Sequence, residues 1–238
     1  MHANKLEIGG GTASGINAVV EGGNNLASGG YSHVEGNGNR ATGYASHVEG
    51  EYNSNFYSHQ GHIEGYLNVA HNERSHVEGS RNAASGQDAH AEGYQDHAIS
   101  FECEVTNVSE GDIIAIPVIP LVEISQSTGF YDKYHLSNGT SVSINSLVVR
   151  TSDITFSVPD SSSTLPSVGD YIVIYNSLKG ARGLASHCEG YNCGSLETYS
   201  HAEGSNTQAS GVCSHAEGTA TTASGTNSHA SGWYTVAD

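Results

Sequence analysis

Histidine and glutamate separated by one residue recur as pairs along this chain, and these side chains could do chemistry. An imidazole and a carboxylate can share a hydrogen bond, and together they suit a zinc or nickel ion. Catalytic zinc uses few ligands and keeps one position open. Eight equivalent pairs fit that pattern poorly, so we assign them no catalytic role and no dedicated metal site. The pairs are His33/Glu35, His47/Glu49, His62/Glu64, His76/Glu78, His90/Glu92, His187/Glu189, His201/Glu203 and His215/Glu217.

Each pair belongs to a five-residue phrase, Ser-His-Val/Ala-Glu-Gly, that returns at intervals of about fourteen residues. A second phrase, Ala-Ser/Thr-Gly, runs between its copies. A repeat this short cannot bury an apolar face alone, so neighbouring repeats must stack. The first phrase occupies 32–36, 46–50, 61–65, 75–79, 89–93, 186–190, 200–204 and 214–218, with degenerate copies at 18–22 and 228–232, and the second occupies 13–15, 27–29, 41–43, 84–86, 209–211 and 223–225.

The alternation within the phrase predicts extended strands. In a strand, Ser32, Val34 and Gly36 point to one side, whereas His33 and Glu35 point to the other. The first set is small in every copy and suits the interior of a narrow coil. Fourteen residues span roughly 46 Å, enough for two short strands and two tight turns. The sequence therefore predicts an all-β solenoid with one repeat per turn, stacked about 4.8 Å apart.

Composition excludes several classes of protein. The chain has 30 Gly but only 4 Pro, which excludes collagen, and a flexible glycine-rich linker would not preserve the repeat. A net charge of -17 argues against binding nucleic acid or an anionic membrane. No apolar run approaches the roughly 18 residues that span a bilayer, and the first residues lack a signal-peptide core. Since Cys103, Cys193 and Cys213 show no paired spacing and Cys188 replaces a small apolar residue, we expect neither a disulfide framework nor a thiolate metal site.

The two alternating phrases resemble the head repeats of trimeric autotransporter adhesins of the YadA-like type, which form left-handed parallel β-rolls in threes. The wording Ser-His-Ala-Glu-Gly is most similar to repeats in tail-fibre proteins of phages and prophages of Gram-positive bacteria. The resemblance covers 9–100 and 183–238. It implies a homotrimer in which the eight His/Glu pairs face the trimer axis. The adhesins carry mostly aliphatic residues at these positions. In this chain the same positions are polar, so either its trimer axis would be polar or this face would be exposed.

A polar axis must be neutralised, because two like charges 4.8 Å apart repel by about 3.5 kcal/mol at an effective dielectric constant of 20. The histidine two residues before each glutamate is the available partner. We therefore expect a trimer-axis ladder of His–Glu hydrogen bonds, either between chains or between adjacent turns. Ion binding on this face and simple solvent exposure are the alternatives. No cofactor is expected, although an ion on the axis stays open.

The repeat stops between 97 and 182, which we interpret as a small β-barrel or sandwich inserted between solenoid segments 1–96 and 183–238. Expected strands lie at 101–108, 112–119, 142–150, 154–158 and 171–175, separated by turn residues. Aromatic and polar side chains gather in one stretch, where they could stack on sugars or pack against a protein receptor. Filling the inserted core is the alternative. This candidate receptor-binding set is Phe130, Tyr131, Asp132, Tyr134 and His135.

These features favour a structural and adhesive function without enzymatic activity, since no hydrolase, metalloprotease or phosphate-loop motif is present. The expected protein is a segment of a phage or prophage tail fibre that contacts itself in trimers and binds a bacterial surface glycan or protein receptor. Its expected place is the virion tail, or else the cell surface. The head of a trimeric bacterial adhesin is one alternative. A tail-associated glycan depolymerase is an alternative from another class, because paired acids are abundant.

Overall fold

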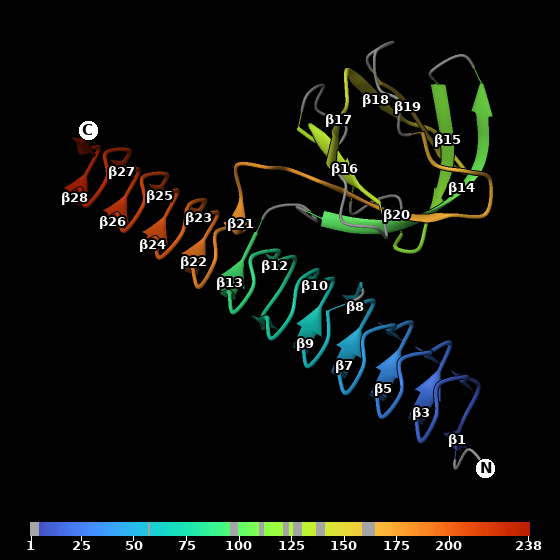
Figure 1. The fold of residues 1–238 in the computed structure, drawn as a ribbon. Helices are drawn as coiled ribbons and strands as arrows, with labels where there is room; N and C mark the ends of the chain where they lie inside the picture. The colour runs from blue at the N-terminus through green and yellow to red at the C-terminus, as the bar shows by residue number, and fades with distance from the viewer. Residues whose placement is uncertain are drawn as a thin grey trace. The chain divides into compact units, whose positions relative to one another are not determined.

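The computed structural model describes residues 5–56, 58–95, 100–109, 112–120, 124–125, 130–136, 141–158 and 165–238, without the side chains of His135 and Ser141. Their regular structure is all β-strand. The chain divides into two compact units, one formed by Met1–Asp96 with Leu178–Asp238 and the other by His97–Ser177 (Figure 1). Within the described ranges, no helix is long and apolar enough to cross a membrane.

The first unit is a β-solenoid built from two parallel sheets of eleven strands each (Figure 1). The first sheet contains β1 (Leu6–Ile8), β3 (Val19–Gly23), β5 (His33–Asn37), β7 (His47–Glu51), β9 (His62–Tyr66), β11 (His76–Val77), β13 (His90–Tyr94), β22 (His187–Tyr191), β24 (His201–Ser205), β26 (His215–Thr219) and β28 (His229–Trp233). The second contains β2 (Thr12–Ala13), β4 (Leu26–Ala27), β6 (Arg40–Ala41), β8 (Ser54–Asn55), β10 (Val69–Ala70), β12 (Ala83–Ala84), β21 (Gly180–Ala181), β23 (Gly194–Ser195), β25 (Gln208–Ala209), β27 (Thr222–Ala223) and β29 (Val236–Ala237).

The register confirms one repeat per turn. Val34 pairs with Val48, fourteen residues later, and the same step recurs along both sheets. One turn is longer, because Val48 pairs with Ile63, and the first is shorter, because Leu6 pairs with Val19. The solenoid also continues across the interruption of the repeat, since β13 pairs with β22 and His90 lies opposite His187.

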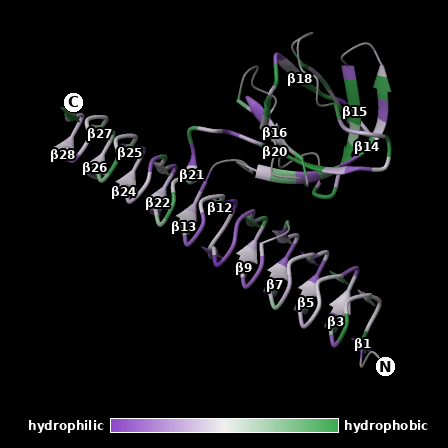
Figure 2. Ribbon diagram, in the orientation of Figure 1, coloured by the Kyte–Doolittle hydropathy of each residue, from purple (hydrophilic) through white to green (hydrophobic). Residues whose placement is uncertain are grey.

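The solenoid interior consists of the small residues that the alternation predicts. Ser32 and Val34 are buried, whereas His33 and Glu35 are only partly so. Figure 2 shows these strands mostly pale, with stronger green along strands of the second unit. The inward side chains of the first sheet become smaller toward the C-terminus, from valine and isoleucine to alanine. Its column is Val20, Val34, Val48, Ile63, Val77, Ala91, Cys188, Ala202, Ala216 and Ala230, facing Ala13, Ala27, Ala41, Ala70, Ala84, Ala181, Ala209 and Ala223 of the second sheet.

Each phrase ends in glycine because its backbone has a positive φ and lies close to the backbone of the next turn. The residue does not serve to fill the interior of the coil. Gly50 has φ +107°, and a Cβ placed there would lie 2.1 Å from the carbonyl oxygen of Gly65 on the next turn. Gly36, expected to point inward, is instead exposed at the end of its strand, with φ +102°. Nearby corner residues such as Tyr31 and Tyr52 also adopt left-handed backbone, with φ 59° and 55°.

Buried asparagine side chains form a hydrogen-bonded ladder at one corner of the coil. Asn53 shows the pattern: its Nδ2 donates to the carbonyl oxygens of Glu49, at 2.7 Å, and Gly65, at 2.8 Å. Its Oδ1 accepts the backbone N–H of Asn68 at 2.8 Å. Such a side chain therefore joins successive turns through both its donors and its acceptor. This asparagine ladder consists of Asn25, Asn39, Asn53, Asn68 and Asn82.

Cys188 and Cys193 form a disulfide, which corrects the expectation that the cysteines are unpaired. Cys188 is an inward residue of β22, as predicted, and Cys193 follows the next corner, so the coil brings their Cα atoms to 6.0 Å. Cys193 occupies the corner position that the asparagine ladder fills in earlier turns. Cys103 is buried, and burial raises the pKa of its thiol well above the usual range.

The second unit contains one seven-stranded antiparallel sheet, in the order β17-β16-β20-β14-β15-β19-β18. The predicted strand at 142–150 is split, because the N–H of Ile144 donates to Asp132 whereas that of Asn145 donates to Ser157. The strand β16 was not predicted. The strands are β14 (Ser100–Ser109), β15 (Asp112–Pro117), β16 (Lys133–His135), β17 (Ser141–Ser143), β18 (Ser146–Val149), β19 (Ile154–Ser157) and β20 (Tyr171–Tyr175).

Candidate functional site: the histidine and glutamate columns

The first sheet aligns the repeated histidines and glutamates into two columns on its outward side. Pairing in register places each His beside the His of the next turn, as His33 beside His47. Because strands in a sheet lie about 4.8 Å apart, equivalent side chains must stack at this spacing. The His column is His33, His47, His62, His76, His90, His187, His201, His215 and His229, and the Glu column is Glu21, Glu35, Glu49, Glu64, Glu78, Glu92, Glu189, Glu203 and Glu217.

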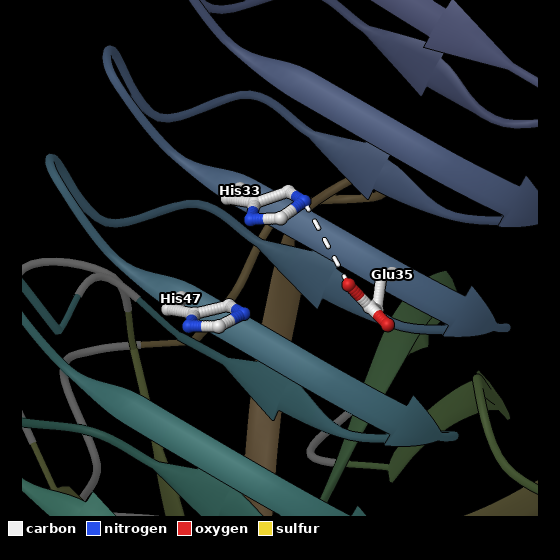
Figure 3. Close-up of side chains that lie close together, drawn as sticks. All are labelled: His33, Glu35 and His47. Carbon is white, nitrogen blue, oxygen red and sulfur yellow. Dashed lines mark ion pairs between the residues drawn. The ribbon is translucent and has the colours of Figure 1, made fainter.

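The imidazole rings of the His column are stacked. Neighbouring ring centroids lie 4.7 to 5.1 Å apart along the whole column. Figure 3 shows the rings of His33 and His47 one above the other, with Glu35 beside them. The arrangement follows from strand spacing, which holds identical side chains in one rotamer above each other.

Within the chain, the two columns approach each other without forming the expected hydrogen bonds. His33 Nε2 lies 4.0 Å from Glu35 Oε2 and 3.9 Å from Glu21 Oε2 on the preceding turn. His90 and Glu92 come closest, with 3.4 Å between Nε2 and Oε2. The predicted ladder between adjacent turns is therefore not formed in the described columns. The hydrogen bonds predicted between chains stay a prediction.

The ring nitrogens that face the Glu column are shielded from solvent but have no hydrogen-bond partner in the described structure. This is notable because the side chains as a whole are partly exposed, 39% for His33 and 34% for His90. A shielded polar atom left unpaired costs about 1–3 kcal/mol. The Nε2 atoms concerned belong to His33, His47, His76, His90, His187, His201 and His215.

Burial and stacking both favour neutral imidazoles. Burial lowers the pKa of His47, His90, His201 and His215, and repulsion from neighbouring histidines lowers it further, whereas nearby glutamates raise it. The Glu column shows the opposite effect at one place. Burial raises the pKa of Glu92, and its contacts with Glu78 and Glu189 add to the rise. At these four histidines the surroundings therefore favour the neutral imidazole over the imidazolium.

Five groups of three side chains in the columns bring potential metal-ligand atoms within 4.8 Å of one another. Four contain two histidines and one glutamate, and the fifth contains one histidine and two glutamates. Imidazole with carboxylate is a ligand set used by first-row divalent ions. The groups are His33/Glu35/His47, His187/Glu189/His201, His201/Glu203/His215, His215/Glu217/His229 and Glu78/His90/Glu92.

The candidate receptor-binding segment mostly contributes to the interior of the second unit. Tyr131 and Tyr134 are buried, which corrects their assignment to a recognition surface and agrees with the core-filling alternative. The Tyr131 ring packs edge-on against Phe101, and its hydroxyl accepts the backbone N–H of Ser125 at 3.1 Å. Burial raises the pKa of Tyr134 to about 12.

The three remaining members of the segment are Phe130, Asp132 and His135. Phe130 is partly buried and contacts Tyr131 edge-on. Asp132 accepts hydrogen bonds from the backbone N–H and the hydroxyl of Ser177, so it fixes the local chain. The side chain of His135 lies outside the described structure.

The asparagine ladder is the polar feature that the sequence interpretation missed, although a signal for it exists. An asparagine follows the phrase glycine by three residues in five successive repeats, as Asn39 follows Gly36. A column of asparagines can link successive turns, because an amide offers both donors and an acceptor, whereas a carboxylate only accepts.

Comparison with protein-family models, curated proteins and solved structures finds no match for the chain.

Proposed function

We propose that this chain is a segment of a homotrimeric, left-handed β-roll fibre, and that the fibre belongs to the tail of a phage or prophage and presents a surface that binds a bacterial host. The head of a trimeric bacterial surface adhesin is the alternative. The observation that carries the proposal is the pair of in-register columns, in which shielded Nε2 atoms such as that of His201 have no hydrogen-bond partner within the described chain.

The thin interior supports association into an oligomer. Toward the C-terminus the inward column is alanine, as at Ala202, Ala216 and Ala230. Burial of apolar surface contributes about 25 cal/mol per Å², so alanines supply little to offset the entropy of ordering the chain. A further buried surface between chains is a physical remedy.

The columns offer a means of joining three chains along the axis. A carboxylate from a second chain can accept a hydrogen bond from a neutral imidazole whose Nε2 carries the proton. This contact would satisfy the Nε2 of His187 or His215 and would place the Glu column beside donors. It would also explain why both residue types return together in each turn.

The oligomeric state of a triple variant tests this proposal. His187→Ala, His201→Ala and His215→Ala together should convert trimers into monomers, as measured by size exclusion with light scattering. The matched control changes three outward positions of the second sheet, Gln208→Ala, Thr222→Ala and Val236→Ala, and should remain trimeric. Trimers that persist in the histidine variant would contradict a His–Glu axis.

Host binding is tested with bacterial envelopes and purified surface polysaccharides. The full chain should bind one of these ligands in a pull-down without releasing reducing ends. Release of reducing ends would instead indicate a glycan depolymerase. Failure to bind any envelope fraction would overturn the proposed adhesive function while leaving the trimer prediction to its own test.

A further inference from the structure

We propose that Glu78, His90 and Glu92 form a binding site for one divalent first-row transition ion, for which Zn²⁺ is the probe. The site lies within a single chain, on adjacent turns of the first sheet. All three ligand residues come from one chain, so the site needs no residue of a partner, although it lies on the columns that are proposed above to face the trimer axis.

His90 and Glu92 form the tightest His–Glu pair of the two columns. Their Nε2 and Oε2 atoms are 3.4 Å apart. In the other His–Glu pairs of the columns that approach within 4.0 Å, the nitrogen and oxygen atoms are 3.7 to 4.0 Å apart. Glu92 is also the least exposed glutamate in these pairs, at 29%. The Nε2 atom is shielded and has no hydrogen-bond partner in the described structure. The pair is therefore partly shielded from water, which favours a bound cation over full hydration of each group.

A separation of 3.4 Å suits two ligands of one tetrahedral ion. Ligands about 2.1 Å from a metal, at an angle of about 109°, lie about 3.4 Å apart. A direct N–H···O hydrogen bond is shorter, with a usual distance of about 2.9 Å. The observed distance between His90 and Glu92 thus matches a bridging ion better than a direct contact.

The neighbouring turn supplies a second carboxylate. Potential ligand atoms of Glu78, His90 and Glu92 all lie within 4.8 Å of one another. The backbone at Glu78 departs from the regular pattern, because β11 ends at Val77, whereas β9 and β13 on either side continue past their glutamates. This group alone combines two carboxylates with one imidazole among the five described, so a divalent ion would neutralise both charges.

Space for further ligands is present at the same place. A groove of about 380 Å³ runs over three turns and is lined by the glutamates and the glycines that follow them. Such a groove can admit water, or the Glu64 carboxylate, to complete the coordination of a metal. The lining residues are Glu64, Gly65, Glu78, Gly79, Glu92 and Gly93.

Titration of the untagged full chain with Zn²⁺ after treatment with a chelator tests the site. Isothermal calorimetry should show one tight site per chain. Co²⁺ should give the visible absorption of a tetrahedral ion. Loss of partners that only orient metal ligands already costs about 10–100-fold in affinity, so Glu92→Gln or Glu78→Gln should weaken binding by about 100-fold or more.

Glu49→Gln is the matched control, because Glu49 occupies the same repeat position but belongs to none of the five groups. It should retain full affinity for Zn²⁺, and all variants should keep the circular dichroism of the parent. Equal affinity of the Glu92→Gln and Glu49→Gln variants would overturn the site. Binding of several ions of equal affinity per chain would also overturn it, because the whole His column would then be the ligand.

Discussion

The side-chain Oδ1 of Asn25 accepts the backbone N–H of Asn39 at 2.9 Å, across one turn of the solenoid. The same bond links each later member of the asparagine ladder to the next. Because the Nδ2 of Asn25 donates to the carbonyl oxygens of Glu21 and Gly36, one side chain satisfies backbone groups on two turns. The buried amides thus add side-chain hydrogen bonds between turns to the backbone bonds of the two sheets, while the His column contributes stacked rings.

The asparagine ladder should contribute strongly to stability. Asn53→Ala removes two donated hydrogen bonds and leaves the N–H of Asn68 without its acceptor, so we expect a loss of about 2–4 kcal/mol. The free energy of unfolding in urea measures this loss. Asn37→Ala, at a partly exposed position, is the control and should change stability little. Equal effects of the two substitutions would show that the ladder is not stabilising.

Glycine at the end of the phrase should be indispensable. Gly50→Ala places a Cβ 2.1 Å from a backbone oxygen and also forces alanine to φ +107°, so we expect a loss of about 3 kcal/mol or more. Gly10→Ala is the control, since no atom lies within 4 Å of its added Cβ. Thermal melting followed by circular dichroism compares the two. A tolerated Gly50→Ala would contradict the close stacking of turns.

Reduction of the disulfide should destabilise the solenoid by about 2 kcal/mol, because the bond closes a short loop in the unfolded chain. The repeat itself supplies a replacement, since Ala202 and Thr207 occupy the positions of Cys188 and Cys193 on the next turn. The double variant Cys188→Ala with Cys193→Thr should therefore melt at one temperature with or without dithiothreitol. The parent should melt lower when reduced, and insensitivity of the parent would argue against the bond.

Mild acid should destabilise the solenoid. The pKa of His90 is lowered in the folded state, so the unfolded chain binds more protons as pH falls below the usual value of 6.5. The stabilisation is complete above that value and is lost as pH falls through the folded pKa. The raised pKa of Glu92 has the opposite effect, because it favours the folded chain as pH falls further. The pKa is lowered, however, for four histidines.

The groups that face His90 define the control for this pH dependence. They are the rings of His76 and His187, each 4.7 Å away, and the carboxylates of Glu78, Glu92 and Glu189. With a chelator present, the melting temperature should fall by several degrees between about pH 7 and about pH 5. The variant His90→Gln with His201→Gln should show a smaller fall. A melting temperature that rises over this range would refute the assignment of neutral stacked imidazoles.

Local patterns in the chain were sufficient to predict the coil. Strict alternation placed Ser32 and Val34 inside and His33 outside, because side chains of a strand alternate between faces. The repeat length fixed one turn per repeat, and the glycines marked places of close backbone approach. The second unit was less predictable, since the interruption of the strand at Ile144 depends on acceptors that are distant in sequence.

The sequence by itself determined the solenoid, its period and, apart from the phrase glycine, which residues face inward and outward, since these depend on local periodicity. Only the tertiary structure decided which polar groups meet. It brought Cys193 back to Cys188, buried Tyr131, and linked Asn25 to Asn39 while leaving His33 and Glu35 about one ångström too far apart for a hydrogen bond. The physical reason is that hydrogen bonds and metal sites depend on distances of a few tenths of an ångström, which rotamers and strand stacking set and which residue spacing alone does not.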